Sequence, residues 1–443
     1  MKKYLLTALA ILIIAIIFLA LGLTFPIYAR ALPLLLIVFV IDGYLWISIR
    51  RKILDLMPFW KFAALIIYWL PLILLISCII AGFFISFAEW NIPLRTLVPG
   101  FIFIFYTFKI LPFIFQLIRD ILRLFRFGLL SFNHGGVRFS DVAKMKWLQV
   151  TGWITGTMFL ILMIIGMIWW NYDFRVKQQV ITLPELPESF DGLRIVQISD
   201  IHTGSWLCKQ ELRKAVALIN AQHADVIFFT GDMVNYTTLD ALPFEEILSH
   251  LKAPFGILAI LGNHDYGAYV NWPSDAAKEK DKKDLYAFYH RLGWKLLLNA
   301  HTVLKRGNDS IAVLGVHNWG KGYRFQKLGD IPAAQKGVEN MQVQLLLSHD
   351  PSFWDTIICH KFQNIDITFS GHTHGFQFGI DCFGIHWSPA QYLYKQWGGL
   401  YEHPVQGSHP QYIYVNVGIG SIAYPGRIGI LPEITVITLK RGK

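Results

Sequence analysis

Long apolar runs dominate the first 172 residues of the chain, and short apolar runs dominate the rest. Five stretches approach or exceed the roughly 20 residues that a helix needs to cross a bilayer. They are 4–29, 31–49, 62–88, 96–118 and 147–172. Three of them carry no charge, whereas 31–49 contains Asp42 and 96–118 contains Lys109. The pattern predicts an all-α membrane region of about five transmembrane helices, the first of which is too long for a cleaved signal peptide.

Beyond residue 180 the apolar runs shorten to the length of buried strands. A stretch rich in Pro and Glu, 180–193, leads into this part. The predicted strands are 193–199, 225–230, 255–262, 342–348, 365–370, 411–418 and 433–440. Residues 209–222 have helical spacing, and strands that alternate with helices indicate an α/β domain with a largely buried sheet. The chain therefore divides into a membrane region, 1–172, and an α/β domain, 173–443.

The formal net charge of +10 belongs to the membrane region. Residues 1–170 contain 15 Lys and Arg against 5 Asp and Glu, whereas residues 171–443 contain 25 of each kind. Nucleic-acid binding is therefore not expected, because the α/β domain has no basic excess. Hydrophobic residues make up 54% of the chain, and the lipid bilayer is the expected partner.

Most basic residues of the membrane region lie in alternate connections between the predicted spans. Twelve of the 15 lie at the N-terminus or after the second and fourth spans: Lys2, Lys3, Arg50, Arg51, Lys52, Lys61, Arg119, Arg123, Arg126, Arg138, Lys144 and Lys146. Positively charged loops stay in the cytoplasm. Five spans then predict a multi-pass protein of the plasma or inner membrane with its α/β domain on the extracytoplasmic side. This orientation depends on the number of spans.

Polar residues that can bind metals follow five of the predicted strands. In chain order they are Asp200 and His202, then Asp232, then Asn263, His264 and Asp265, then His349, and last His372 and His374. Ligands of open α/β sheets bind beyond the carboxyl ends of the strands, where these side chains can converge. Each motif alone is also typical of an ordinary turn. Their occurrence at five strand ends in succession favours a common site.

The residue types of this set suit divalent cations. Carboxylate and imidazole ligands favour Mn, Fe, Zn or similar ions, and no cysteine is involved. Seven of these nine residues, all except His264 and Asp265, suit two ions if one carboxylate bridges them, and a neutral Asn limits the negative charge. Two such ions can lower the pKa of a bridging water and bind phosphoryl oxygens. A site of this kind can supply a metal-bound hydroxide for hydrolysis.

The motifs D-x-H, G-D, G-N-H-D, a lone H and G-H-x-H, in this order, resemble the calcineurin-like metallophosphoesterase superfamily. The resemblance covers about residues 175–440. The opening "FDGLRIVQISDIHTG" and the closing "YPGRIGILPEITVITL" are similar to the YkuE-like membrane-associated phosphoesterases. The resemblance implies an αββα sandwich that acts as a metal-dependent phosphoric ester hydrolase with two divalent metal ions.

The resemblance also implies a role for each matching residue. Asp200, His202, Asp232 and His374 would hold one ion. Asp232 as the bridge, Asn263, His349 and His372 would hold the other, and His264 would be the catalytic histidine. Phe376 stands where the family often has glycine in "GHTHGGQ", which could change the rim of the substrate site. Asn235 stands where purple acid phosphatases have a ligand tyrosine, which disfavours that branch.

Two further residues have alternative roles. Asp265 could act in catalysis by orienting His264, or it could cap a turn. Arg427, in "YPGRIG", could bind a phosphate oxygen of the substrate, or it could pair with a surface carboxylate.

The sequence leaves the substrate undecided and allows two rival functions. The aromatic segment 383–404 could form a rim at the membrane interface, where Trp and Tyr are enriched, or a small core under a long loop. A rim would favour a lipid-linked phosphodiester or pyrophosphate as the substrate. The first rival is a protein-interaction scaffold, with or without metal. The second is a membrane sensor or transporter with an accessory phosphoesterase domain, for which the acid Asp42 inside a span is the main support.

Overall fold

The computed structural model describes residues 32–134, 138–322, 325–407 and 409–442. The chain forms two compact units, each described by itself below. Unit 1 comprises residues up to Ile80 together with Phe101–Ile161, and unit 2 comprises Ala81–Gly100 together with Leu162–Lys443. The predicted boundary at residue 172 stays a prediction.

Four helices within the described residues are long and apolar enough to cross a membrane. They are α3 (Leu32–Leu54), α4 (Pro58–Gly82), α5 (Ile92–His134) and α6 (Lys146–Ile168). Four of the five predicted spans correspond to them, and the predicted span 4–29 lies outside the described residues. Helix α5 is longer than its predicted span. Arg119, Arg123 and Arg126 therefore lie on a helix, and not in the loop that the charge pattern predicted.

Asp42 has partners inside unit 1. The Lys109 ammonium lies 2.6 Å from Oδ1 of Asp42, and the Tyr106 hydroxyl donates to Oδ2 over 2.7 Å. Lys109 also donates to the carbonyl oxygen of Tyr68. Both charged side chains are buried and hydrogen-bonded, as expected for ionic groups inside a helix bundle. These contacts favour a role for Asp42 in helix packing over a transport site.

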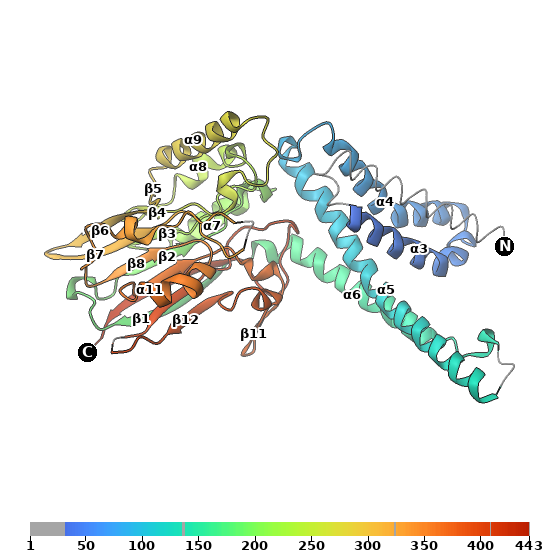
Figure 1. The fold of residues 1–443 in the computed structure, drawn as a ribbon. Coiled ribbons are helices and arrows are strands. Elements are labelled where there is room, and N and C mark those ends of the chain that lie inside the picture. The colour runs from blue at the N-terminus through green and yellow to red at the C-terminus, as the bar shows by residue number, and fades with distance from the viewer. Residues whose placement is uncertain (1–31, 135–137, 323–324, 408, 443) are drawn as a thin grey trace. The chain divides into compact units, whose positions relative to one another are not determined.

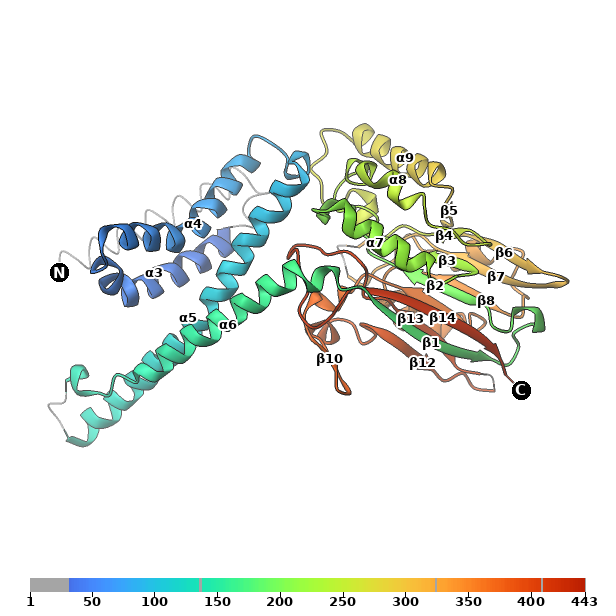
Figure 2. The same ribbon diagram turned by 180° about the vertical axis from the view of Figure 1, so that it is seen from behind.

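Unit 2 contains two mixed six-stranded sheets (Figures 1 and 2). The first has the order β1-β14-β2-β3-β4-β5, formed by Arg175–Leu183, Glu433–Arg441, Arg194–Ile198, Val226–Phe229, Ile257–Ala259 and Lys295–Leu296. The second has the order β12-β13-β9-β8-β7-β6, formed by Gly399–His403, Gln411–Val415, Ile367–Ser370, Gln344–Leu347, Asp309–Gly315 and Ala300–Arg306. Strands β2 to β5 run parallel, as do β7, β8, β9 and β13. Parallel neighbours place the carboxyl ends of consecutive strands at one edge of each sheet.

The main core lies between the two sheets. Val226 and Phe228 of the first sheet belong to the same buried cluster as Leu345 and Phe369 of the second. The rings of Phe228 and Phe369 meet edge to face, with centroids 4.9 Å apart. Because side chains alternate along a strand, Ile227 and Phe229 point to the opposite face, where they need a second apolar layer.

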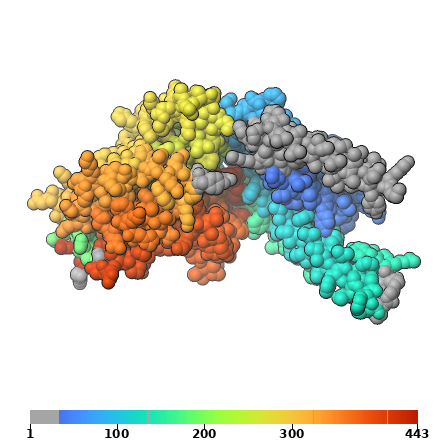
Figure 3. All heavy atoms as spheres, in the orientation of Figure 1, coloured from blue at the N-terminus to red at the C-terminus, as the bar shows by residue number. Residues whose placement is uncertain are grey.

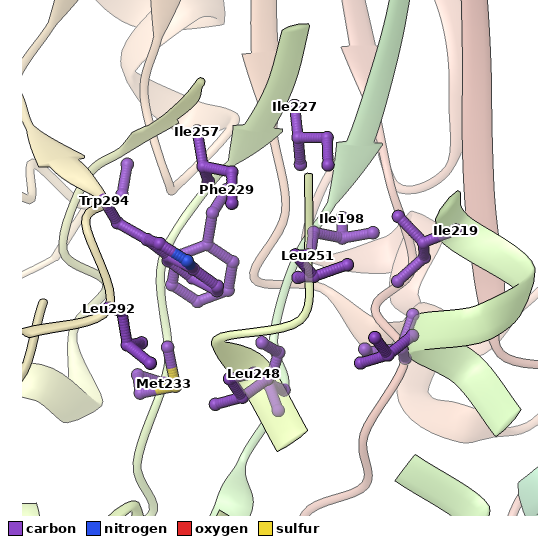
Figure 4. Packing of buried hydrophobic residues seen from close by; sticks show 14 of the residues in the cluster. Ile198, Ile219, Ile227, Phe229, Met233, Leu248, Leu251, Ile257, Leu292 and Trp294 are labelled. Atoms are coloured by element: carbon purple, nitrogen blue, oxygen red, sulfur yellow. The ribbon is translucent and has the colours of Figure 1, made fainter. Parts of the chain in front are cut away.

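Helices supply that layer on both outer faces. On the first sheet, α7 (Lys209–Asn220), α8 (Glu245–Leu248) and α9 (Asp275–Arg291) cover a buried cluster that includes Ile227, Phe229 and Trp294 (Figure 4). On the second sheet, α10 (Ile331–Gln335) and α11 (Cys359–Lys361) contribute to another cluster. The predicted αββα sandwich is therefore confirmed. Figure 3 shows the second-sheet side of this domain as a continuous packed surface of orange and red segments.

Strands β1 and β5 of the first sheet and β6, β7 and β12 of the second were not predicted. Part of β1, 180–183, lies in the stretch that the sequence indicated as a mere lead-in, yet β1 runs over Arg175–Leu183 and pairs with β14 in parallel. Its residues alternate between exposed and buried only near its end, so the apolar pattern that marks the central strands is absent. A short antiparallel hairpin, β10 (Ile380–Cys382) with β11 (Ile385–Trp387), lies outside both sheets.

Candidate metal centre

The predicted metal-binding residues come together at the carboxyl ends of five parallel strands. Strands β2, β3 and β4 deliver those of the first sheet, and β8 and β9 deliver those of the second. The residues are Asp200, His202, Asp232, Asn263, His349, His372 and His374. All of them except His372 are buried, and the His372 side chain is only about one tenth exposed. Residues 174 positions apart can share one site because the two sheets pack face to face with these strand ends at the same edge.

One group of donor atoms surrounds the end of β2. Nε2 of His374 lies 3.2 Å from Oδ1 of Asp200 and 3.1 Å from Nε2 of His202. Nε2 of His202 lies 3.5 Å from Oδ2 of Asp232. Asp200, His202 and His374 can therefore direct one atom each toward a single cation.

A second group shares the same oxygen of Asp232. Nε2 of His349 lies 3.2 Å from Oδ2 of Asp232 and 3.1 Å from Oδ1 of Asn263. Nδ1 of His372 lies 3.3 Å from Nε2 of His349. Oδ2 of Asp232 thus borders both groups, which is the position required of a bridging carboxylate.

The polar atoms of the second group face inward because their other sides are occupied. Nδ1 of His349 lies 2.7 Å from the carbonyl oxygen of Thr230 and donates its proton there. The amide nitrogen of Asn263 donates to the Tyr269 hydroxyl over 2.8 Å, which turns Oδ1 toward the site. The lone pairs of the His349 imidazole and the Asn263 amide oxygen then point at one another and at the Asp232 carboxylate. Acceptor atoms that face each other in this way fit a cation between them. The residues present therefore fit divalent metal ions.

The two carboxylates keep their negative charge in this setting. Burial by itself would raise the pKa of Asp200, but the adjacent His374 together with His349 outweighs burial and lowers that pKa. Burial opposes ionisation of Asp232 in the same way, and His349, His264 and His202 together hold its pKa well below the usual value. The site therefore offers two negative charges to incoming cations at neutral pH.

His264 lies beside both groups with one ring nitrogen free for chemistry. Its Nδ1 lies 2.9 Å from the carbonyl oxygen of Asn235, and its ring meets that of His202 edge to face with centroids 4.8 Å apart. The Tyr269 ring stacks on its other side at 4.2 Å. A proton donated from Nδ1 to Asn235 leaves Nε2 on the side of the site, where a substrate oxygen could reach it.

The Asp265 carboxylate supports the backbone and does not reach the His264 ring. It accepts hydrogen bonds from the backbone N–H groups of Asp232, Met233, Val234 and Gly262, over 2.9 to 3.2 Å. Burial and the nearby Asp232 charge raise its pKa to about 7. The structure therefore favours the capping alternative for Asp265 over direct participation in catalysis.

Arg427 is buried, and its guanidinium is surrounded by main-chain carbonyls. Its guanidinium donates to the carbonyl oxygens of Val417, Gly418 and Gly420, and one nitrogen lies 3.5 Å from Nδ1 of His374. Among the described residues Arg427 binds main-chain carbonyls and no surface carboxylate, so the pairing alternative does not apply, and binding of a substrate phosphate stays a prediction. Its position behind His374 makes it a support for the site.

The backbone of the site is held in a sparsely populated conformation. Asp200, His202, Asp232, His372 and His374 all have φ between 47° and 73°, in the left-handed region. Non-glycine residues there cost of order 1–3 kcal/mol each and cluster at functional sites. Gly262 allows the close packing that results, because a Cβ at this position would lie 2.1 Å from Oδ1 of Asp232.

Three residues that contact the predicted ligands were missed from the sequence. Tyr269 binds the Asn263 amide, as described above. The Tyr394 hydroxyl lies 2.9 Å from Nε2 of His372, and Oδ2 of the buried Asp350 lies 3.5 Å from the same nitrogen. The adjacency of Asp350 to His349 was a usable signal, whereas nothing local marks Tyr394.

The membrane part and the sandwich each match a family of known proteins. Residues 193–376 match the family described as calcineurin-like phosphoesterase. The chain contains a calcineurin-like phosphoesterase domain. Residues 23–170 match the family described as probable calcineurin-like phosphoesterase, transmembrane domain, so the calcineurin-like domain belongs to a membrane-linked metallophosphoesterase.

Relatives of the calcineurin-like domain occur in bacteria and in a vertebrate. The metallophosphoesterase YkuE of Bacillus subtilis is 29% identical over 264 residues, which cover 58% of this chain and 82% of YkuE. A transmembrane protein with metallophosphoesterase domain of Danio rerio is 28% identical, over 60% of this chain and 57% of that protein. The UDP-2,3-diacylglucosamine pyrophosphatase LpxG of Chlamydia muridarum is 28% identical, over 53% of this chain and 81% of LpxG. These relatives support the predicted phosphoric ester hydrolase of the YkuE-like kind.

Proposed function

We propose that the protein hydrolyses a phosphodiester or pyrophosphate bond at a centre of two divalent metal ions such as Mn, Fe or Zn. The observation that carries this proposal is the position of Oδ2 of Asp232, within 3.5 Å of His202 on one side and 3.2 Å of His349 on the other. Asp200, His202, Asp232 and His374 would hold one ion, and Asp232, Asn263, His349 and His372 the other. When bound, such ions would neutralise phosphoryl oxygens and acidify water for attack on phosphorus.

The residues around the ions would complete the reaction. His264, when protonated on both ring nitrogens, would donate the Nε2 proton to the leaving oxygen and become neutral, while its Nδ1–H stays bound to the carbonyl oxygen of Asn235. A positioned proton donor typically contributes about 10²–10⁴-fold to the rate. Asn263 and His372, fixed by Tyr269 and Tyr394, would keep their donor atoms directed at the ion.

The catalytic domain would face the extracytoplasmic side. The connection between α4 and α5 lies in the same compact unit as the catalytic domain, so both belong on one side of the membrane. The connections before α4 and after α5, with the helix ends that adjoin them, would then lie on the other side, and these stretches together carry most of the basic residues of the membrane region. This argument supports the proposed side without counting the predicted span 4–29.

The substrate would be lipid-linked. The relative named as a UDP-2,3-diacylglucosamine pyrophosphatase supports a pyrophosphate bond next to acyl chains. Tyr392 and Leu393 are 75% and 71% exposed, and they precede Tyr394, whose hydroxyl contacts His372. Exposed apolar side chains at this place suit the acyl or isoprenoid part of a substrate that stays in the bilayer.

A hydrolysis screen on the full-length protein in detergent or nanodiscs would test the proposal. Model phosphodiesters, monoesters and pyrophosphates would be offered with EDTA and then with added Mn²⁺. We expect hydrolysis that EDTA abolishes and Mn²⁺ restores. Equal turnover with EDTA and with Mn²⁺ would refute a metal-dependent reaction.

A further inference from the structure

Part of the membrane region belongs to the catalytic unit. Residues Ala81–Gly100, which link α4 to α5, group with the sandwich in unit 2. Within this segment Arg95, in the first turn of α5, is only 6% exposed. Its guanidinium forms a hydrogen-bonded ion pair with Asp240, whose side chain is 2% exposed. A buried pair of this kind binds the connection tightly to the sandwich, because breaking it would leave a charge unpaired.

The surroundings of Arg95 fix its guanidinium in place. A second nitrogen donates to the carbonyl oxygen of Ala88 over 3.0 Å, and the guanidinium lies 5.2 Å from the centre of the Tyr236 ring. A Cβ at Gly204 would lie 2.7 Å from Arg95 and 2.6 Å from Asp240. The absence of a side chain at Gly204 lets the ion pair approach the turn that follows His202.

The ion pair is connected to His264 through the turn after Asp232. The second carboxylate oxygen of Asp240 accepts hydrogen bonds from the backbone N–H groups of Asn235, over 3.2 Å, and Tyr236, over 2.9 Å. The carbonyl oxygen of Asn235 is the group that accepts from Nδ1 of His264. Arg95 therefore fixes the Asp240 carboxylate. That carboxylate fixes the turn at Asn235 and Tyr236, and the Asn235 carbonyl of this turn orients His264.

We propose that Arg95 is a positioning residue for His264, so that the rate of hydrolysis depends on the connection between two membrane helices. The inference rests on the proposed function, in which His264 donates a proton. A shift of the α4–α5 connection would move Asp240, turn the Asn235 carbonyl and misalign the imidazole. The membrane region then regulates turnover, in addition to anchoring the domain.

The test compares variants of the full-length protein in nanodiscs. Arg95→Met should lower kcat about 10–100-fold, the range seen when residues that orient functional side chains are lost. KM and bound metal should stay within about twofold of wild type. Arg95→Lys keeps the charge and should restore part of kcat. Arg291→Met, which breaks an exposed pair with Glu245, serves as a matched control and should leave kcat unchanged.

A second background separates positioning from general damage. If Arg95 acts through His264, then Arg95→Met added to His264→Ala should change kcat less than about twofold. An equal loss of kcat in both backgrounds, or a loss of metal, would overturn the proposal. If Arg95→Met does not fold, the double variant Arg95→Met/Asp240→Asn removes both charges and is measured in its place. Failure of the proposed function itself would be recognised separately, as a wild type without metal-dependent hydrolysis or as full activity in His264→Ala.

Discussion

The backbone N–H of His264 donates a hydrogen bond to Oδ1 of Asp232 over 2.9 Å. This bond uses one oxygen of the carboxylate and leaves Oδ2 to face both groups of metal-binding atoms. It also ties the residue proposed as proton donor to the residue proposed as bridge. A displacement of Asp232 would therefore also displace His264, and a displacement of His264 would displace Asp232.

Asp232→Asn should remove most of the activity. The amide has no negative charge and offers one acceptor oxygen, so it cannot hold two cations while it also accepts the His264 N–H. Turnover at saturating Mn²⁺ should fall by more than about 100-fold, since even indirect supports of a metal site cost 10–100-fold. Bound metal, measured by elemental analysis, should fall to one ion or fewer per chain. Near-normal turnover would contradict the dinuclear assignment.

His264→Ala should lower turnover and spare the metal. Loss of a proton donor predicts a kcat about 10²–10⁴-fold lower. Metal content should not change, because the seven proposed ligands remain. His250→Ala, at an exposed position, is the control and should behave as wild type. If metal is lost instead, His264 is itself a ligand or a structural residue.

Asp265→Asn should lower the stability of the protein more than it lowers kcat. Each carboxylate oxygen accepts two backbone N–H groups, and the amide nitrogen of Asn would face two of these donors. The loss of two hydrogen bonds to a charged group predicts a cost of about 3 kcal/mol or more. Thermal unfolding should start several degrees lower than in wild type, whereas Asp284→Asn, in an exposed pair with Lys280, should show no shift. Unchanged stability with a reduced kcat would instead support the alternative that Asp265 orients His264.

The proposed ligands could be predicted from sequence because they follow five strand ends. A buried apolar run that ends in Asp, His or Asn can be recognised locally, and the parallel strands β2, β3, β4, β8 and β9 bring these ends together. An α/β domain with a buried sheet could be predicted for the same reason, since its central strands are apolar, whereas the two-sheet sandwich was implied only by the family resemblance.

The supports of the site could not be predicted, because their partners are distant in sequence. Arg95 and Asp240 are 145 positions apart, and nothing near either residue reveals the other. Arg427 resembled a surface residue because its partners are main-chain carbonyls, which have no sequence signature. The strand β1 was missed since only one end of it is buried.

The aromatic segment 383–404 contains both buried residues, which form a small core, and exposed residues, which could contact lipid. Trp397 is 3% exposed, packs with Val417 and Ile430, and stacks on His386, so the core alternative applies to it. Trp397→Ala should destabilise the domain by about 3–5 kcal/mol. It is therefore unsuited as a test of lipid binding.

Tyr392→Ala with Leu393→Ala is the suitable variant, because both side chains are exposed. It should keep the stability of wild type to within about 0.5 kcal/mol. Hydrolysis of a lipid-linked pyrophosphate in membranes should fall several-fold, while hydrolysis of a small soluble ester should not change. Equal rates on both substrates, relative to wild type, would argue against an apolar rim that binds lipid.

A reporter fused after Lys443 should reveal the side of the membrane. An alkaline phosphatase fusion, active only outside the cytoplasm, should give signal, and a cytoplasmic reporter at the same position should be silent. A second fusion between α5 and α6, after Lys144, should show the reverse. Signal from the cytoplasmic reporter at Lys443 would invert the proposed orientation.

The buried pair of Arg95 and Asp240 also bears on how a soluble version of this protein could be made. A fragment that starts after α6, at residue 173, looks like a natural truncation but discards the arginine. Asp240 would then lose its counter-ion, and the surface that residues 81–100 cover in unit 2 would be exposed to water. Such a fragment would be prone to aggregate even though every strand of the sandwich is present. Residues 81–100 fused to its front should improve its expression.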